Sequence, residues 1–231
     1  MKRFYKQAAA EPVEGGWRVA LDGRPVRTPK GAPQLLPTGP LAAAMAREWQ
    51  DQGDELDPAR LRLRDLADHA IDIVAATPAA SVTRLLGYAE TDTLCYRADP
   101  DEPLFRRQRE QWDPLLAAFE AREGVVLVRV SGIIHRAQPA ATMARLKARL
   151  EPLDPFQLAA LEVMTSLAAS LCIGLSALEP DADGEALWRA ANLEEDWQVE
   201  QWGEDSDAAA RRARRGREFL DALEFARLAR G

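Results

Sequence analysis

The chain has 231 residues, of which 47% are hydrophobic and 29% are charged, and its net charge is −7 at pH 7. This composition is that of a globular protein with a sizeable core, and it excludes a disordered chain. The acidic balance argues against nucleic-acid binding through the whole surface, and we expect the basic run at 211–217 to be neutralised by the acids that precede it.

The cysteines and the apolar segments indicate a reducing compartment and no membrane insertion. Cys95 and Cys172 lie within apolar stretches, so we expect reduced thiols in the core. The basic N-terminus lacks the apolar segment of a secretory signal. The apolar run Phe156–Leu178 contains Gln157 and Glu162, and a buried helix explains it better than a membrane span.

The first forty residues predict a small β element. Trp17–Leu21 and Arg24–Thr28 flank Asp22-Gly23, which is a strong signal for a hairpin turn. Regularly spaced prolines then surround a third extended piece near 34–36, as is typical of edge strands and turns. Such an element is too small to fold alone.

Three helices and a strand–helix–strand unit follow. Thr38 is a candidate N-cap, and the predicted helices are Thr38–Gln50, Asp65–Ala76 with Leu66, Ala70, Ile73 and Val74 inward, and Ala79–Tyr88. Next come a short strand near 91–96, an amphipathic helix ended by Gly124, and a β-branched run at 125–130. This order indicates a βαβ unit. Alternatively, residues 125–134 pair with the N-terminal hairpin.

From Pro139 onward the pattern predicts only helices. The expected helices are Ala140–Leu150, Pro155–Ala177, Asp183–Trp202 and Ser206–Ala229. The predicted fold class is therefore α+β. A β-rich N-terminal domain with α/β elements spans 1–135, including the hairpin 17–28, and an all-helical C-terminal domain spans 136–231.

The stretch NLEEDWQVEQWG at 192–203 is the most distinctive part of the sequence. In one helix, Leu193, Trp197 and Glu200 share a stripe, while Val199 and Trp202 fall on roughly the opposite side. Such a helix must be packed from two sides or carry an exposed binding ridge. Glu200 is an acid where an apolar residue is expected. It forms either a structural ion pair with a downstream arginine or a polar contact kept for a partner.

Motifs of catalysis and metal binding are not found. The sequence contains no P-loop, GxGxxG, nucleophile elbow or paired-cysteine zinc spacing. Apart from Asp65 and Asp72 near His69, neither His69 nor His135 has a further ligand at metal-binding spacing, so we interpret both as solvated or capped. We therefore expect no cofactor, no metal and no catalytic residue.

Several stretches together resemble a known family. FYKQ near the start, LDGRPVRTP, AREWQDQ, ETDTLCYRA, REQWDPLL and EEDWQVEQWGED are similar to the assembly chaperone of the F-type ATP synthase alpha subunit, from about residue 3 to 219 and in the same order. The most specific pieces are ETDTLCYRA and QVEQWGED. The family is found in bacteria and in mitochondria.

The resemblance implies a function as well as a fold. It implies a non-enzymatic monomer without cofactors that binds the free alpha subunit transiently and prevents its aggregation. Glu200 is then the acid of the QxEQWG motif, and the predicted partner-binding residues are Glu195, Trp197, Glu200, Gln201 and Trp202. The start at MKRFY predicts a cytoplasmic bacterial protein, whereas eukaryotic relatives lie in the mitochondrial matrix.

Two other functions remain compatible with the residues. One is a small-molecule enzyme with a helical pocket in which Glu200 acts as general acid or base. The other is a constitutive structural subunit. A closed pocket with a second titratable group would favour the enzyme, and a shallow exposed apolar surface would favour the chaperone.

Overall fold

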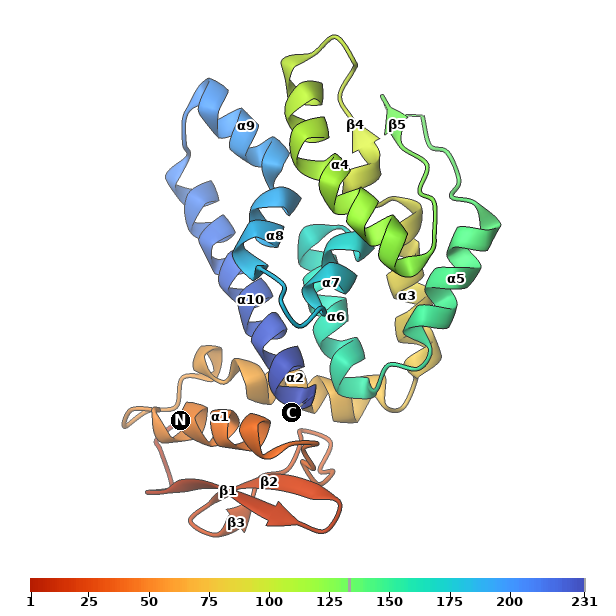
Figure 1. Cartoon of the computed structure of the whole chain (residues 1–231). Helices are drawn as coiled ribbons and strands as arrows, with labels where there is room; N and C mark the ends of the chain where they lie inside the picture. Colours follow the sequence, from red (N-terminus) through yellow and green to blue (C-terminus); the bar gives the residue numbers. More distant parts are fainter. Residues whose placement is uncertain (133, 231) are drawn as a thin grey trace. The chain divides into compact units, whose positions relative to one another are not determined.

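The computed structural model describes residues 1–132 and 134–230. They form two compact units, which are described separately: unit 1 contains Met1–Pro78, Asp154–Ala160 and the chain end from Asp221, and unit 2 contains Ala79–Leu153 and Leu161–Leu220. Helices accompany one antiparallel and one parallel sheet (Figure 1), which confirms the predicted α+β class. The sequence-based boundary after residue 135 stays a prediction.

The sheet of unit 1 has three antiparallel strands, β1 (Ala8–Val13), β2 (Gly16–Leu21) and β3 (Arg24–Pro25), in that order. The predicted hairpin at Asp22-Gly23 is confirmed, and both turn residues have positive φ (48° and 78°), as a type I′ turn requires. Strand β1 was missed, because its sequence AAAEPV lacks the β-branched and aromatic residues typical of strands.

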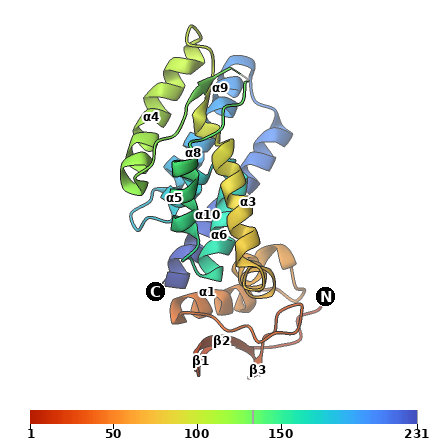
Figure 2. The ribbon, with the colours of Figure 1, turned by 90° about the vertical axis from the view of Figure 1, so that its right-hand side faces the viewer.

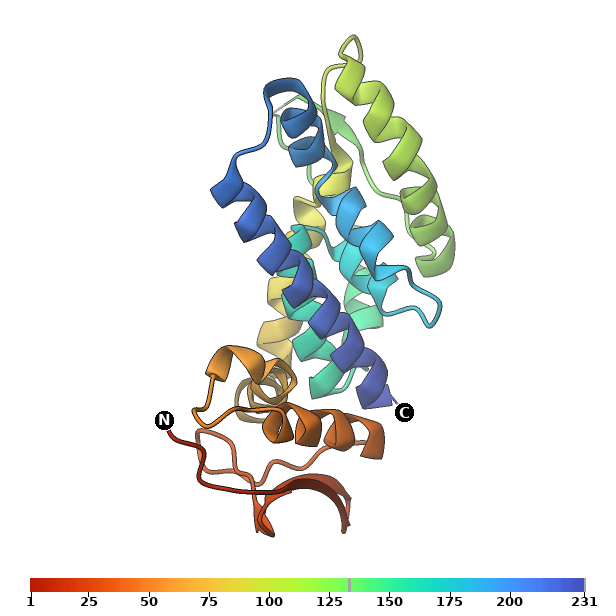
Figure 3. The ribbon, with the colours of Figure 1, turned by 90° about the vertical axis from the view of Figure 1, so that its left-hand side faces the viewer.

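Helix α1 (Gly39–Gln50) begins after the predicted cap Thr38, whose hydroxyl accepts a hydrogen bond from the backbone N–H of Leu41 at 3.2 Å. It lies against the curved hairpin, as Figure 3 shows. The N-terminal segment is fastened to the end of α1. The Tyr5 hydroxyl donates to the carbonyl of Trp49 at 2.6 Å, and the Arg3 guanidinium donates to the carbonyls of residues 50 and 52. A cation at a helix C-terminus also complements the helix dipole.

The second predicted helix is divided into α2 (Arg62–His69) and a π-helical turn, η2 (Ala70–Val74), and it follows the 3-10 turn η1 (Pro58–Arg60). The π turn rotates the chain, so Ile73 is 40% exposed and not inward as predicted. Without a side-chain cap of its own, the start of α2 depends on Glu48 of α1. The two carboxylate oxygens of Glu48 accept from the N–H groups of residues 63 and 64, at 2.7 and 3.1 Å.

Unit 2 contains the predicted βαβ unit. Strand β4 (Tyr96–Arg97) is parallel to β5 (Val130–Ser131), and α4 (Pro103–Glu123) connects them. Gly124 ends α4 with a left-handed φ of 66°, as predicted. The alternative pairing with the N-terminal hairpin is therefore wrong. The strands are shorter than expected, because the 3-10 turn η3 (Thr93–Cys95) occupies most of the first.

A buried carboxylate joins η3 to a later helix. Asp92 is fully buried and accepts backbone hydrogen bonds from Leu94 at 3.1 Å and Cys172 at 2.9 Å. Burial raises the pKa of Asp92, and burial also raises the pKa of the Cys95 thiol to about 12. Both cysteines are buried and free, so the predicted core thiols are confirmed.

The remaining helices are α3 (Pro78–Glu90), α5 (Ala140–Leu150), α6 (Pro155–Ala168), α7 (Leu171–Ala177), α8 (Gly184–Ala191), α9 (Leu193–Trp202) and α10 (Ser206–Arg230). Figures 1 and 2 show α3 and α5 side by side. The single helix predicted over 183–202 is wrong, because the chain leaves the helical conformation at Asn192 (φ −108°, ψ 20°).

The apolar run 156–178 is also two helices. Ala169 has a positive φ of 49°, and the Ser170 hydroxyl then caps α7 by accepting from the N–H of Ile173 at 3.0 Å. Among the described residues, no single helix is long and apolar enough to cross a membrane. The consecutive segments 62–74 and 78–95 reach that length and composition only when counted together.

The burial of Glu48 predicts a specific dependence of stability on pH. Burial raises the pKa of Glu48 from 4.5 to about 7, which outweighs the lowering by its two backbone hydrogen bonds. The folded state therefore holds a proton that the unfolded state releases above about pH 4.5. This contribution to the unfolding free energy is present below that pH and is lost as the pH rises through about 7.

We expect Glu48→Gln to remove this part of the pH dependence. Urea unfolding of both proteins between pH 5 and 8 measures it, and Glu14→Gln, at an exposed turn position, is the matched control. If the unfolding free energy changed with pH equally in the wild type and in Glu48→Gln, Glu48 would not be the source of this pH dependence.

Candidate functional site

Helix α9, which carries the predicted partner-binding residues, starts from a buried turn. Asn192 is only 8% exposed, and its side-chain amide donates to the carbonyl of Trp188 at 2.7 Å. Leu193 follows and is buried. The chain therefore changes direction at a fixed point before α9 begins.

The position of this turn is set by α4. Trp112 of α4 is fully buried, and its indole N–H donates to the carbonyl of Ala190 at 2.8 Å. Arg97 lies over the ring of Trp112, with its guanidinium carbon 4.9 Å from the ring centroid, and forms an ion pair with Asp113 at 2.9 Å. The end of α8 is thus held against α4 immediately before α9.

Two further contacts join α9 to the same helix. The Gln108 amide donates to the Glu194 carboxylate at 2.7 Å. Nearly two turns further along α9, both carboxylate oxygens of Glu200 accept from the guanidinium of Arg107, one of them at 2.7 Å. Arg107 also lies over the ring of Trp197, with its guanidinium carbon 5.7 Å from the centroid. Arg107 therefore contacts two of the predicted site residues at once.

A third element completes the support of α9. Arg212 of α10 forms an ion pair with Asp196, which raises the pKa of the arginine. Helix α10 also lies alongside α8, where the rings of Trp188 and Phe219 are 5.6 Å apart (Figure 3). Gly216 fits under the indole of Trp188, because a Cβ atom there would lie 2.8 Å from the Nε1 atom.

Glu200 forms an ion pair, as one of the two interpretations predicts, but its partner differs from the predicted one. The ion pair is with Arg107, which is 93 residues upstream, and not with a downstream arginine. The carboxylate is half exposed, and the hydrogen bonds from Arg107 hold the pKa of Glu200 below its ordinary value. A group that gives up its proton so readily is poorly suited to act as a general acid or base near neutral pH.

The opposite side and the end of α9 are open to solvent. Trp202 is 79% exposed, and Gln201 is exposed beside it. Glu195 is partly exposed in the acidic first turn. The structure therefore brings all five predicted residues onto one short helix. A tryptophan that exposes so much of its surface beside acidic groups is typical of protein contact surfaces.

The sequence did not identify the residues that hold this helix, namely Arg107, Gln108 and Arg212. Each lies on a neighbouring helix, and nothing in its local pattern distinguishes it from other surface polar residues. Among the described residues, no group of three or more His, Cys, Asp or Glu side chains could hold a metal ion. Chemically, the surface offers an apolar ring, carboxylates and an amide for contact with another molecule.

Comparison with known proteins gives the class of this molecule. Residues 2–120 match the family described as ATP12 chaperone protein. The mitochondrial atp12 protein of Schizosaccharomyces pombe is 30% identical over 223 residues, which cover 90% of this chain and 75% of the relative.

Two solved structures are similar over nearly the whole chain. Atp12 from Paracoccus denitrificans has a TM-score of 0.94 and 37% identity, covering 99% of this chain and 98% of its own. The Atu1473 protein from Agrobacterium tumefaciens has the same TM-score and identity, covering 98% of this chain and 85% of its own.

These matches define a chaperone class, and the chain belongs to the ATP12 chaperone family. The family consists of non-enzymatic assembly factors of the ATP synthase, which confirms the family resemblance and the expectation that the protein is not an enzyme. The alternative in which Glu200 serves as an acid–base catalyst is therefore wrong.

Because the ion pair of Glu200 is exposed, we expect Glu200→Gln and Glu200→Ala to fold with melting temperatures close to that of the wild type. Exposed pairs contribute little to stability, since water screens them and two side chains must be ordered. Thermal unfolding monitored by circular dichroism checks this expectation. A large fall in melting temperature, equal in both variants, would show that the pair is structural.

The end of α9 depends on Gly203, whose φ of 89° and ψ of 168° lie in a region that only glycine adopts easily. No neighbouring atom lies within 4 Å of a Cβ added there, so a substitution is opposed by the backbone alone. We expect Gly203→Ala to lower the unfolding free energy by about 1–3 kcal/mol or to fray the last turn of α9.

Hydrogen exchange of the amides at 199–203 together with urea unfolding distinguishes these two effects. Gly87→Ala is the matched control, because Gly87 lies within α3, has nothing within 4 Å of an added Cβ and has no positive φ. The control should be stabilised by about 0.5–1 kcal/mol. Equal effects of the two substitutions would refute the role assigned to Gly203.

Proposed function

We propose that this chain binds the free alpha subunit of the F-type ATP synthase and prevents its aggregation before assembly. The observation that carries the proposal is the exposed Trp202 at the end of a helix in which Asp196 and Trp197 contact arginines of neighbouring helices. An unassembled subunit exposes the apolar surface that it later buries against its partners. A chaperone for such a subunit needs an apolar contact with a polar border.

Helix α9 provides this combination. The indole of Trp202 supplies the apolar contact, and Gln201 beside it supplies hydrogen-bonding groups. Glu195 and Glu200 supply negative charge, which selects a client surface with basic residues around an apolar centre. Trp197 lies against Arg107 on one side but is only partly buried, so it also belongs to the contact surface. The partner-binding set is therefore proposed as Glu195, Trp197, Glu200, Gln201 and Trp202.

Binding and release are proposed to need no chemical step. A transient complex is compatible with a contact surface that spans one ten-residue helix, since small interfaces are typical of weak encounters. The client leaves when its own assembly partner buries the same apolar surface more extensively. We propose that the protein is a monomer and that it acts in the compartment where the alpha subunit folds.

The test is suppression of alpha-subunit aggregation, measured by light scattering at a fixed ratio of the two proteins. We expect Trp202→Ala and Glu200→Ala to remain folded but to bind the client at least about tenfold more weakly. Loss of a central aromatic contact typically costs about 2 kcal/mol or more in binding. Isothermal titration or co-elution of the complex gives the affinity independently.

Two control variants match these substitutions. Val126→Ala truncates another exposed apolar side chain, which is 69% exposed in unit 2. Glu185→Ala removes an exposed acid that pairs with Arg189 on α8. Both controls should suppress aggregation like the wild type. A folded Trp202→Ala protein with undiminished suppression would remove α9 from the proposed site.

A further inference from the structure

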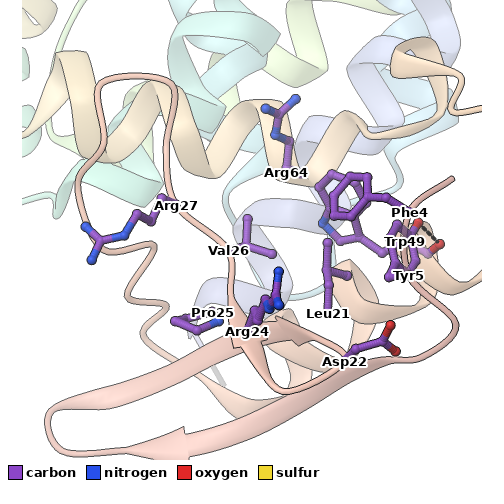
Figure 4. Close-up of a pocket in the computed structure, with 10 residues that line it drawn as sticks. All are labelled: Phe4, Tyr5, Leu21, Asp22, Arg24, Pro25, Val26, Arg27, Trp49 and Arg64. Atoms are coloured by element: carbon purple, nitrogen blue, oxygen red, sulfur yellow. Dashed lines mark hydrogen bonds between the residues drawn. The ribbon is translucent and has the colours of Figure 1, made fainter. Parts of the chain in front are cut away.

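A pocket in unit 1 has a chemistry different from that of α9. It has a volume of about 500 Å³ and lies among the N-terminal segment, the β2–β3 hairpin, α1 and α2 (Figure 4). The rings of Phe4, Tyr5 and Trp49 form one wall. Neighbouring ring centroids are 5.3 and 5.8 Å apart, in edge-to-face arrangements. Phe4 is 67% exposed, so this aromatic wall continues to the surface.

The lining of the pocket contains a polar group without a partner. Trp49 is only 7% exposed, and within the described residues its buried indole N–H has no hydrogen-bond acceptor. Buried indole N–H groups normally have one, because leaving such a donor unpaired costs free energy. In Figure 4 the indole nitrogen lies on the side of the ring that faces Leu21 and Val26. An acceptor atom of a bound molecule would satisfy it.

The rim of the pocket is basic in a protein whose net charge is −7. Arg24 has no ion pair among the described residues, and Arg27 uses one guanidinium nitrogen for the carbonyl of Gly31 at 2.8 Å. Arg64 is already paired with two acids of its own helix, at 2.9 and 2.8 Å. In Figure 4 the Arg27 side chain points away from the aromatic wall, so Arg24 is the cation available to a ligand there, and Arg27 adds positive charge to the rim.

Asp22, the one acid in the lining, interacts electrostatically with Arg24, but its carboxylate oxygens are already bonded to the backbone. Asp22 accepts hydrogen bonds from the backbone N–H groups of Lys6 and Gln7, at distances between 2.9 and 3.1 Å. These bonds lower the pKa of Asp22, which therefore remains ionised and bonded to the N-terminal segment. The pocket thus combines an apolar wall, an unpaired donor and the guanidinium group of Arg24, with a second arginine at its rim.

We propose that this pocket binds a short segment of a partner protein in which an acidic side chain stands next to an apolar one. Its carboxylate pairs with Arg24, and its apolar side chain packs on Phe4 and Val26. A backbone carbonyl of the segment accepts from the indole N–H of Trp49. Guanidinium groups bind carboxylates through two parallel hydrogen bonds, which gives direction as well as charge. This site is independent of α9 and of the client proposed for it.

The indole N–H of Trp49 provides a direct probe in the full-length protein labelled with nitrogen-15. The chain has six tryptophans, and the Trp49 signal is the one absent from the spectrum of Trp49→Phe. The peptides GELFG and GQLFG, blocked at both ends, differ only by the acid. We expect GELFG to shift this signal in a saturable way and GQLFG to bind at least about tenfold more weakly.

Paired variants test the charge. Arg24→Gln with Arg27→Gln should weaken GELFG binding at least about tenfold, whereas Arg211→Gln with Arg214→Gln, which removes the same charge from an exposed face of α10, should not. Equal binding of both peptides, no shift with either, or equal effects of both variants would overturn the proposal. An equal shift with inorganic phosphate would overturn it too, since the pocket would then bind anions without recognising a peptide.

Discussion

The burial of Trp112 is the constraint on which the α9 surface depends. Its indole ring fills the space under Arg97, and its N–H fixes the carbonyl of Ala190. The same face of α4 then presents Gln108 and Arg107, about one turn earlier, to the next segment of chain. Residues 190, 194 and 200 therefore meet residues 112, 108 and 107 in antiparallel order. One packed aromatic residue thus sets the register in which α9 lies along α4.

This register explains why the sequence singled out α9 but not the residues that support it. The spacing of apolar residues correctly predicted α1 and α4, since each has an apolar face and a recognisable start or end. Helix α9 has no such face, and only Leu193 is buried in it. Its interpretation rested on a motif, and its partners come from segments 86 and 93 residues away. Local periodicity contains no information about such contacts.

The helix breaks show the same limitation at shorter range. Asn192 and Ala169 interrupt segments whose composition favours continuous helices, because tertiary contacts stabilise the interrupted conformation. Near Asn192 the carbonyl of Ala190 accepts from the indole of Trp112, and the carbonyl of Ala169 accepts from the hydroxyl of Thr93. Alanine is the best helix former, so a positive φ at Ala169 could not be predicted from propensity. By contrast, the turn at Asp22-Gly23 was predictable, because its residue types alone favour positive φ.

The contacts of α9 weaken along its length, which bears on how a chaperone can hold a client without trapping it. At its start, Leu193 is buried and Glu194 is bonded to α4. In the middle, Asp196 and Trp197 are partly covered by arginines. At its end, Glu200 has only an exposed ion pair, and Trp202 has most of its surface in water. Exposed ion pairs contribute little to stability, so the last turn can adjust its conformation at little cost while the first turn stays fixed. The side chains of Glu200 and Trp202 can therefore change position with little change in free energy. A contact of this kind favours reversible binding over a permanent interface.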